Sequence, residues 1–104
     1  MTKVATKMKL YKGFIEEYKK RHNPIWPELQ DLLESYGISD YSIFFDETTD
    51  SLFAVLTAQD PGRLDHLKAE EIMKKWWTFM KDIMDTNEDH SPVSIPLVEV
   101  FYMP

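Results

Sequence analysis

Tyr18 and His22 stand four residues apart in a segment whose apolar spacing is typical of a helix. Residues separated by four positions lie on the same side of an α-helix, so both rings face the same space. Imidazole has an unperturbed pKa of about 6.5 and can give and take a proton near neutral pH. The pair therefore has the chemistry of an acid–base group in a small-molecule pocket. The alternative is a partly exposed histidine at a structural bend.

The sequence RHNPIWPEL, residues 21–29, interrupts the helical pattern that continues on both sides of it. Each proline lacks a backbone N–H and disfavours helix in the residue before it. We expect the first helix to end at His22, and the second to begin with Asn23 as its N-cap and Pro24 at its first position. Such a break lets His22 face a cleft that a straight, packed helix would close.

Trp76 and Trp77 lie on a third candidate helix, residues 69–84. Its apolar residues recur at steps of three and four, as on one buried face: Ile72, Met73, Trp76, Trp77, Met80, Ile83 and Met84. The two indoles are therefore either core residues or flat apolar walls of a site. Because helix neighbours point about 100° apart, one indole can line a site while the other packs.

The composition excludes several kinds of site. The chain has no cysteine, so it forms no disulfide, thiolate nucleophile or cysteine-based zinc site. No pair of histidines has the HExxH-type spacing of metal ligands, and His66 and His90 lie in polar segments. The net charge of −6 disfavours nucleic acid as a partner. We therefore expect no metal at this site.

No segment carries the pattern of a targeting or membrane signal. The N-terminus lacks the apolar run of a signal peptide, and no stretch approaches the roughly 20 apolar residues of a membrane span. We therefore expect a cytoplasmic protein. The basic run at 19–21 follows Glu16 and Glu17 by one turn, which predicts a solvated helix face with i,i+4 ion pairs.

The elements around these residues follow the order β-α-β-β-α-β in one domain, residues 1–104. Strands are predicted at 3–10, 38–46, 51–58 and 97–103. This order predicts the α+β class, with a ferredoxin-like sandwich of one antiparallel sheet and both helical segments on one face. The middle strands are apolar on both faces, so the uncovered face needs a partner, which a dimer of packed sheets would supply.

Three stretches resemble the L-rhamnose mutarotases: EEYKKRHNPIWPEL, KKWW and SPVSIPLVEVFYMP. The resemblance runs over essentially the whole chain. It implies a ferredoxin-like domain that pairs as a dimeric α/β barrel, and hence a homodimer. It also implies an isomerase of rhamnose metabolism that interconverts the α and β anomers of L-rhamnose, with no metal and no organic cofactor.

The same resemblance implies the roles of five residues. The catalytic proton donor of the family falls on His22, and its sugar-binding positions fall on Tyr18, Tyr41, Trp76 and Trp77. Mutarotation opens and recloses a hemiacetal, so it needs a group that moves a proton near neutral pH, which suits imidazole. The sequence does not identify the base that would partner His22.

Three alternatives stay open on the sequence alone. A related enzyme could act on L-fucose or another 6-deoxy sugar by the same chemistry. Dimeric α/β barrels also serve small monooxygenases and haem-degrading enzymes. A non-catalytic sugar-binding module would keep the pocket and lack the reaction. Fold alone does not separate these functions.

Overall fold

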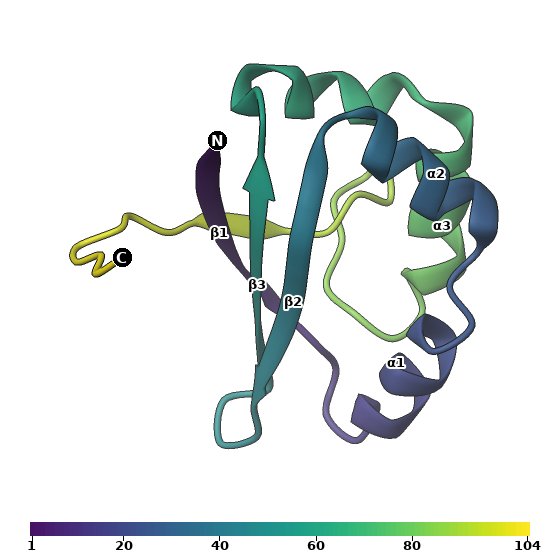
Figure 1. Ribbon diagram of the computed structural model, residues 1–104. Coiled ribbons are helices and arrows are strands. Elements are labelled where there is room, and N and C mark those ends of the chain that lie inside the picture. Colours follow the sequence, from purple (N-terminus) through teal and green to yellow (C-terminus); the bar gives the residue numbers. More distant parts are fainter.

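The computed structural model describes residues 1–104 and is drawn in Figure 1. Along the chain its elements are β1 (Thr2–Lys9), α1 (Ile15–His22), α2 (Pro27–Ser35), β2 (Ile38–Asp46), β3 (Ser51–Ala58), the 3₁₀ helix η1 (Pro61–Ala69), α3 (Glu71–Met80) and β4 (Ser94–Pro96). No helix combines the length and the apolar character that crossing a lipid bilayer would require.

The four strands form one antiparallel sheet in the order β2-β3-β1-β4. The pairing of β1 with β3 runs from Thr2 opposite Ala58 to Lys9 opposite Ser51. Figure 1 shows α1, α2 and α3 on one side of this sheet. The predicted α+β class and the antiparallel sheet are confirmed, and the helices lie on one face as expected.

The hairpin between β2 and β3 forms where it was expected, around the short polar turn. The carboxylate of Asp46 accepts a hydrogen bond from the backbone N–H of Thr48 at 3.0 Å. Asp50 then takes a left-handed φ of 55°, which Asp tolerates better than most residues. The turn places Phe45 directly opposite Leu52.

The helical pattern breaks after His22, as predicted, but the expected cap was wrong. Asn23 keeps helical backbone angles, and its N–H donates to the carbonyl of Lys19 at 2.9 Å, so Asn23 closes α1. Trp26 takes the extended conformation (φ −58°, ψ 127°) and caps α2, with Pro27 at its first position. The second proline therefore starts the new helix, because Asn23 is already used at the end of the old one.

The core lies between the sheet and the helices. The last helix ends at Met80, four residues before its predicted end at Met84. Met84 instead forms an antiparallel bridge with Leu10, which draws the chain toward β1 while Ile83 and Met84 stay buried. The buried cluster comprises Leu10, Tyr18, Leu29, Leu52, Trp76, Met80, Ile83 and Met84.

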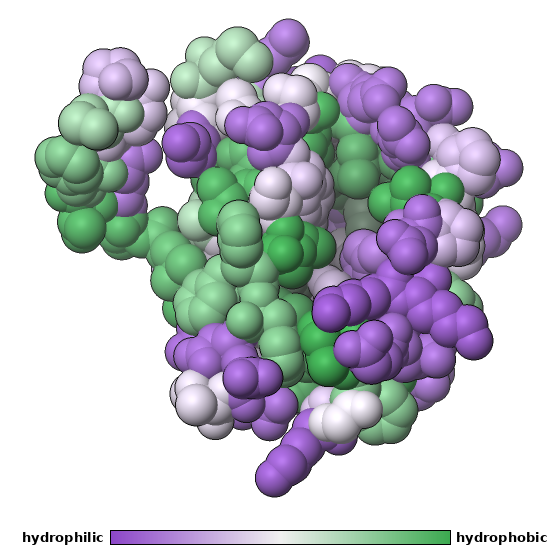
Figure 2. Space-filling view, turned by 60° about the horizontal axis from the view of Figure 1, so that its bottom comes forward, coloured by the Kyte–Doolittle hydropathy of each residue, from purple (hydrophilic) through white to green (hydrophobic).

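The terminal strand predicted at 97–103 was wrong. The strand β4 covers Ser94–Pro96, and Leu97 makes the last backbone bond to the sheet, from its N–H to the carbonyl of Ala5 at 2.9 Å. Residues 97–104, here called the C-terminal arm, leave the sheet on the side away from the helices (Figure 1). Figure 2 shows the arm as a largely hydrophobic segment that stands clear of the body. A strand needs a neighbour, and this chain offers the arm none.

Candidate active site

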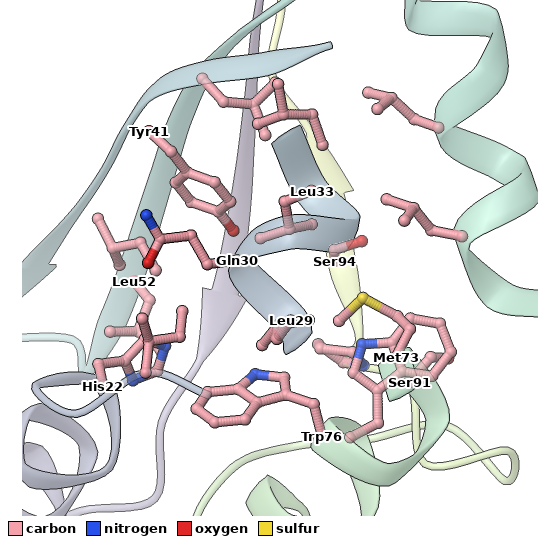
Figure 3. A pocket seen from close by; sticks show the side chains of 18 of the residues that line it. His22, Leu29, Gln30, Leu33, Tyr41, Leu52, Met73, Trp76, Ser91 and Ser94 are labelled. Atoms are coloured by element: carbon pink, nitrogen blue, oxygen red, sulfur yellow. The ribbon is translucent and has the colours of Figure 1, made fainter. Parts of the chain in front are cut away.

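A cavity of about 1120 Å³ opens between the sheet and the helices. Its volume lies slightly above the range of about 300–1,000 Å³ that is usual for ligand sites. Every helix and the strands β2 and β3 contribute side chains to it, together with the loop that leads into β4. Figure 3 shows side chains from both layers converging on this space.

A smaller space of about 80 Å³, here called the inner chamber, adjoins the cavity at its aromatic end. It is lined by Met8, Tyr18, His22, Tyr41, Ile43, Met73, Trp76, Trp77, Met80, Met84 and Pro92. The five residues predicted from the sequence thus meet in one place, although they come from three different elements. No Asp, Glu, Lys or Arg side chain lines the inner chamber.

His22 is held by the end of α1 and by two aromatic neighbours. Its ring stacks on Tyr18, with centroids 4.2 Å apart, and meets the edge of Trp76 at 5.1 Å. Its Nδ1 lies 2.9 Å from the carbonyl oxygen of Tyr18. A carbonyl oxygen can only accept, so Nδ1 carries the hydrogen and Nε2 keeps its lone pair.

The environment of His22 favours its neutral form. Burial lowers the pKa of the imidazole below its ordinary value of 6.5, and the hydrogen bond to the Tyr18 carbonyl opposes this effect only in part. At neutral pH the ring is therefore mainly uncharged. Because Nδ1 is occupied, the imidazole has Nε2 available as a proton acceptor.

Tyr18 and Tyr41 supply two phenol groups to the inner chamber. Burial raises the pKa of both phenols, and the proximity of Tyr41 raises that of Tyr18 further. Both hydroxyls therefore stay protonated and can donate or accept hydrogen bonds. Although Tyr41 is 44% exposed, Figure 3 shows its hydroxyl pointing from β2 into the cavity.

Trp76 and Trp77 do not have the same environment. Trp76 is 7% exposed and belongs to the buried core cluster, yet it also lines the inner chamber. Trp77 is half-buried and lines the same chamber. Both readings of the sequence thus hold for Trp76, which packs with one part of its indole and offers another to the site.

Trp26 supports the site from behind and was not predicted from the sequence. Its ring meets Trp76 edge-on, with centroids 5.1 Å apart, and lies 5.4 Å from Phe79. It caps α2 and does not line either cavity. The sequence shows that Trp26 directly precedes Pro27, but it does not indicate that Trp26 contacts a helix 50 residues later.

Arg21 was predicted to lie on a solvated helix face, and this was wrong. The expected i,i+4 pair with Glu17 forms at 2.8 Å, but the Arg21 side chain is only 13% exposed. Its guanidinium also donates to Asp82 at 2.8 and 3.2 Å and to the Phe79 carbonyl at 2.7 Å. Arg21 thus ties the end of α1, where His22 lies, to the end of α3.

The remaining histidines lie outside the inner chamber. His66 is exposed on η1, and Nδ1 of His90 lies 3.2 Å from the hydroxyl oxygen of Thr78. No three His, Asp or Glu side chains are grouped as metal ligands. Polar groups that could bind hydroxyls lie along the wider cavity: Asn23, Gln30, Asn87, Ser91 and Ser94.

Known proteins resemble this chain over its full length. A family model described as L-rhamnose mutarotase matches residues 3–103. The L-rhamnose mutarotases of Formosa agariphila and Bacteroides thetaiotaomicron are 55% and 52% identical over 103 residues, with 99% of each chain covered. A crystal structure of L-rhamnose mutarotase from Formosa agariphila aligns over 100% of both chains, with a TM-score of 0.93 and 53% identity. The chain belongs to the L-rhamnose mutarotase family, a family of carbohydrate isomerases.

Proposed function

We propose that the protein interconverts the α and β anomers of L-rhamnose, with His22 as the group that moves the proton. The observation that carries this proposal is the makeup of the inner chamber: one imidazole with an open Nε2, two protonated phenols and no charged side chain. Family membership supplies the substrate.

The reaction requires one proton to leave the anomeric hydroxyl and one to reach the ring oxygen. Neutral His22 accepts the first proton at Nε2 while the anomeric oxygen forms a carbonyl and the bond from C1 to the ring oxygen breaks. The resulting imidazolium then donates from Nε2 to the ring oxygen. Rotation about the C1–C2 bond presents the other face of the aldehyde, and the reverse steps close the ring. No proton or electron is consumed overall.

This scheme gives His22 both proton transfers, because the inner chamber holds no second group that titrates near neutral pH. The phenols are unsuited as bases, since burial raises the pKa of each. In the scheme Tyr18 and Tyr41 bind sugar hydroxyls instead. The indoles of Trp76 and Trp77 provide apolar surface for the sugar ring and its C6 methyl group.

The direct test is NMR exchange between the two anomers of L-rhamnose, with L-fucose measured alongside. We expect wild-type protein to accelerate exchange of L-rhamnose, and His22→Ala to lose that acceleration while remaining folded. His66→Ala is the matched control, since His66 is exposed and lines neither cavity. Wild-type exchange at the buffer rate would contradict the proposal. Faster exchange of L-fucose than of L-rhamnose would show that the preferred substrate is another 6-deoxy sugar.

We further propose that two copies pair as a homodimer with their sheets packed together. The sheet face opposite the helices carries exposed apolar side chains beside the lysines of β1: Phe44 stands opposite Phe53, and both Phe44 and Ile95 are more than half exposed. The arm adds Val98, Val100 and Phe101, which are 85%, 93% and 79% exposed. Apolar surface of this kind indicates an interface.

A second copy is the natural occupant, because each chain carries both an apolar arm and exposed apolar side chains on this face. Eight extended residues reach about 26 Å, which matches the shortest dimension of the molecule, 26 Å. Each arm can thus cross the sheet of its partner. Light scattering should give the mass of two chains for the whole protein and of one chain after removal of residues 97–104. A monomer at micromolar concentration would contradict the pairing. A cytoplasmic location stays a prediction.

A further inference from the structure

The strand β2 contains one irregularity, directly before Tyr41. Ser39 stands opposite Thr57, and Ser42 stands opposite Val55. Asp40 and Tyr41 therefore share a single opposite residue, Leu56. Two residues opposite one is a β-bulge, a feature that re-aims side chains and is frequent beside active sites.

The bulge changes which side chains of β2 face the helices. Ile38 is buried and lines the cavity. Side chains alternate along a regular strand, so an uninterrupted β2 would turn Asp40 toward the helices and Tyr41 away from them. The bulge absorbs one residue, and after it Tyr41 and Ile43 both line the inner chamber. The side chain of Tyr41 thus points toward the helices because the bulge at Asp40 precedes it.

Asp40 has the backbone that this bulge requires. Its φ is +49°, in the left-handed region, where bulges of this type usually place glycine. Asp enters that region more readily than most residues with a side chain, whereas β-branched residues do so rarely. The Asp40 side chain is exposed and lines neither cavity. Its contribution is therefore conformational.

We propose that Asp40 is a positioning residue, whose left-handed backbone holds the bulge that directs the Tyr41 hydroxyl into the inner chamber beside Tyr18. The kinetic part rests on the proposed function, since it takes Tyr41 as a contact of the sugar. A residue that disfavours the left-handed region weakens the bulge and moves the hydroxyl out of reach. Glycine at the same position keeps the bulge.

The experiment compares Asp40→Val with Asp40→Gly and uses Asp50 as the matched control. Asp50 has almost the same φ, 55°, but lies in the hairpin turn and lines neither cavity. Asp50→Val should therefore lower stability in a similar way without moving Tyr41. Asp40→Ala is the milder variant if Asp40→Val folds poorly.

In anomer-exchange kinetics, Asp40→Val should raise KM for L-rhamnose about tenfold, the effect of one lost hydrogen bond. Asp40→Gly should stay within about twofold of wild type, and Asp50→Val should leave KM unchanged. Equal KM values for Asp40→Val and wild type would overturn the proposal. So would equal effects of Asp40→Val and Asp50→Val, which would indicate a loss of stability alone.

A second readout does not depend on the reaction. In protein with labelled tyrosine, NMR contacts between the Tyr41 ring and side chains of the inner chamber should disappear in Asp40→Val. They should persist in Asp40→Gly and Asp50→Val. If wild-type protein fails to accelerate exchange, the proposed function fails while these contacts still decide the role of Asp40. Unchanged contacts in a folded Asp40→Val would overturn that role.

Discussion

The two faces of the sheet differ in how their apolar side chains are covered. On the face that carries the helices, one chain supplies the buried cluster, the inner chamber and the contacts that hold His22. On the opposite face, Phe44, Ile95 and the C-terminal arm remain exposed. The five residues proposed for the reaction line one chamber on the helix-covered face, and the exposed apolar surface lies on the other face. We therefore expect the proposed reaction and the proposed pairing to be separable by mutation.

The largest effect should come from Trp76→Ala on the helix-covered face. Trp76 is 7% exposed and contacts His22, Trp26 and Phe79 through its ring. Its truncation should lower the free energy of unfolding by about 3–5 kcal/mol. Denaturant unfolding measures this, with the half-buried Trp77→Ala as comparison. A loss below that of Trp77→Ala would show that Trp76 is not the main packing residue of the site.

A smaller loss is expected from Arg21→Met. The substitution leaves much of the packing stem and removes the bonds to Asp82, Glu17 and the Phe79 carbonyl. Because Asp82 is largely exposed, we expect a loss of about 1–2 kcal/mol of stability. A double-mutant cycle with Asp82→Asn isolates the pair. A role of Arg21 in orienting His22 predicts a fall in kcat as well, whereas Lys20→Met, at an exposed position of the same helix that lines neither cavity, should change neither quantity.

Stability and exchange rate should both depend on the pH through His22, which is the only histidine of the inner chamber on the helix-covered face. The folded pKa of His22 lies below the ordinary value of 6.5, so the unfolded chain binds the proton more tightly. The contribution of His22 to stability should therefore be lost as pH falls from about 6.5 through the folded pKa.

The exchange rate should follow the same titration, because protonation removes the lone pair of Nε2. After subtraction of the buffer rate, we expect it to fall about tenfold per pH unit below the folded pKa. Histidine NMR in wild-type protein, with His22→Gln to assign the signal, checks the pKa directly. A rate that rises toward acid would indicate that the protonated form of His22 starts the reaction.

The smallest effect should separate two adjacent residues of β2. Phe44 is 62% exposed on the outer face, whereas Ile43 lines the inner chamber. At concentrations where the chain is monomeric, Phe44→Ser should change the free energy of unfolding by no more than about 0.5 kcal/mol. Ile43→Ala should cost about 1–3 kcal/mol. At higher concentration Phe44→Ser should instead weaken pairing, which sedimentation measures.

The features predicted correctly are those that depend on local chemistry. The helix break at residue 23 follows from two prolines, and the hairpin follows from short polar turn chemistry. The meeting of Tyr18 and His22 follows from their spacing on one helix. That Tyr41, Trp76 and Trp77 join them was implied by the family resemblance, not by any spacing in the chain.

The features missed are those set by distant segments. Arg21 and Asp82 are 61 residues apart, so nothing near Arg21 indicated the pair. The bulge at Asp40 exists only in the register between β2 and β3. The terminal strand was expected from its β-branched and aromatic residues, but a strand pattern does not reveal whether its neighbour belongs to the same chain.

The bond from His22 Nδ1 to the Tyr18 carbonyl has a consequence for how this site can vary. In many enzymes a carboxylate orients the histidine, and one substitution can delete that carboxylate. Here the acceptor is main chain, 2.9 Å away on the preceding turn of the same helix. No replacement of the Tyr18 side chain removes it, so position 18 can mutate without releasing the tautomer. The nitrogen that we propose moves the proton is thus set by the backbone of α1 and not by a neighbouring side chain.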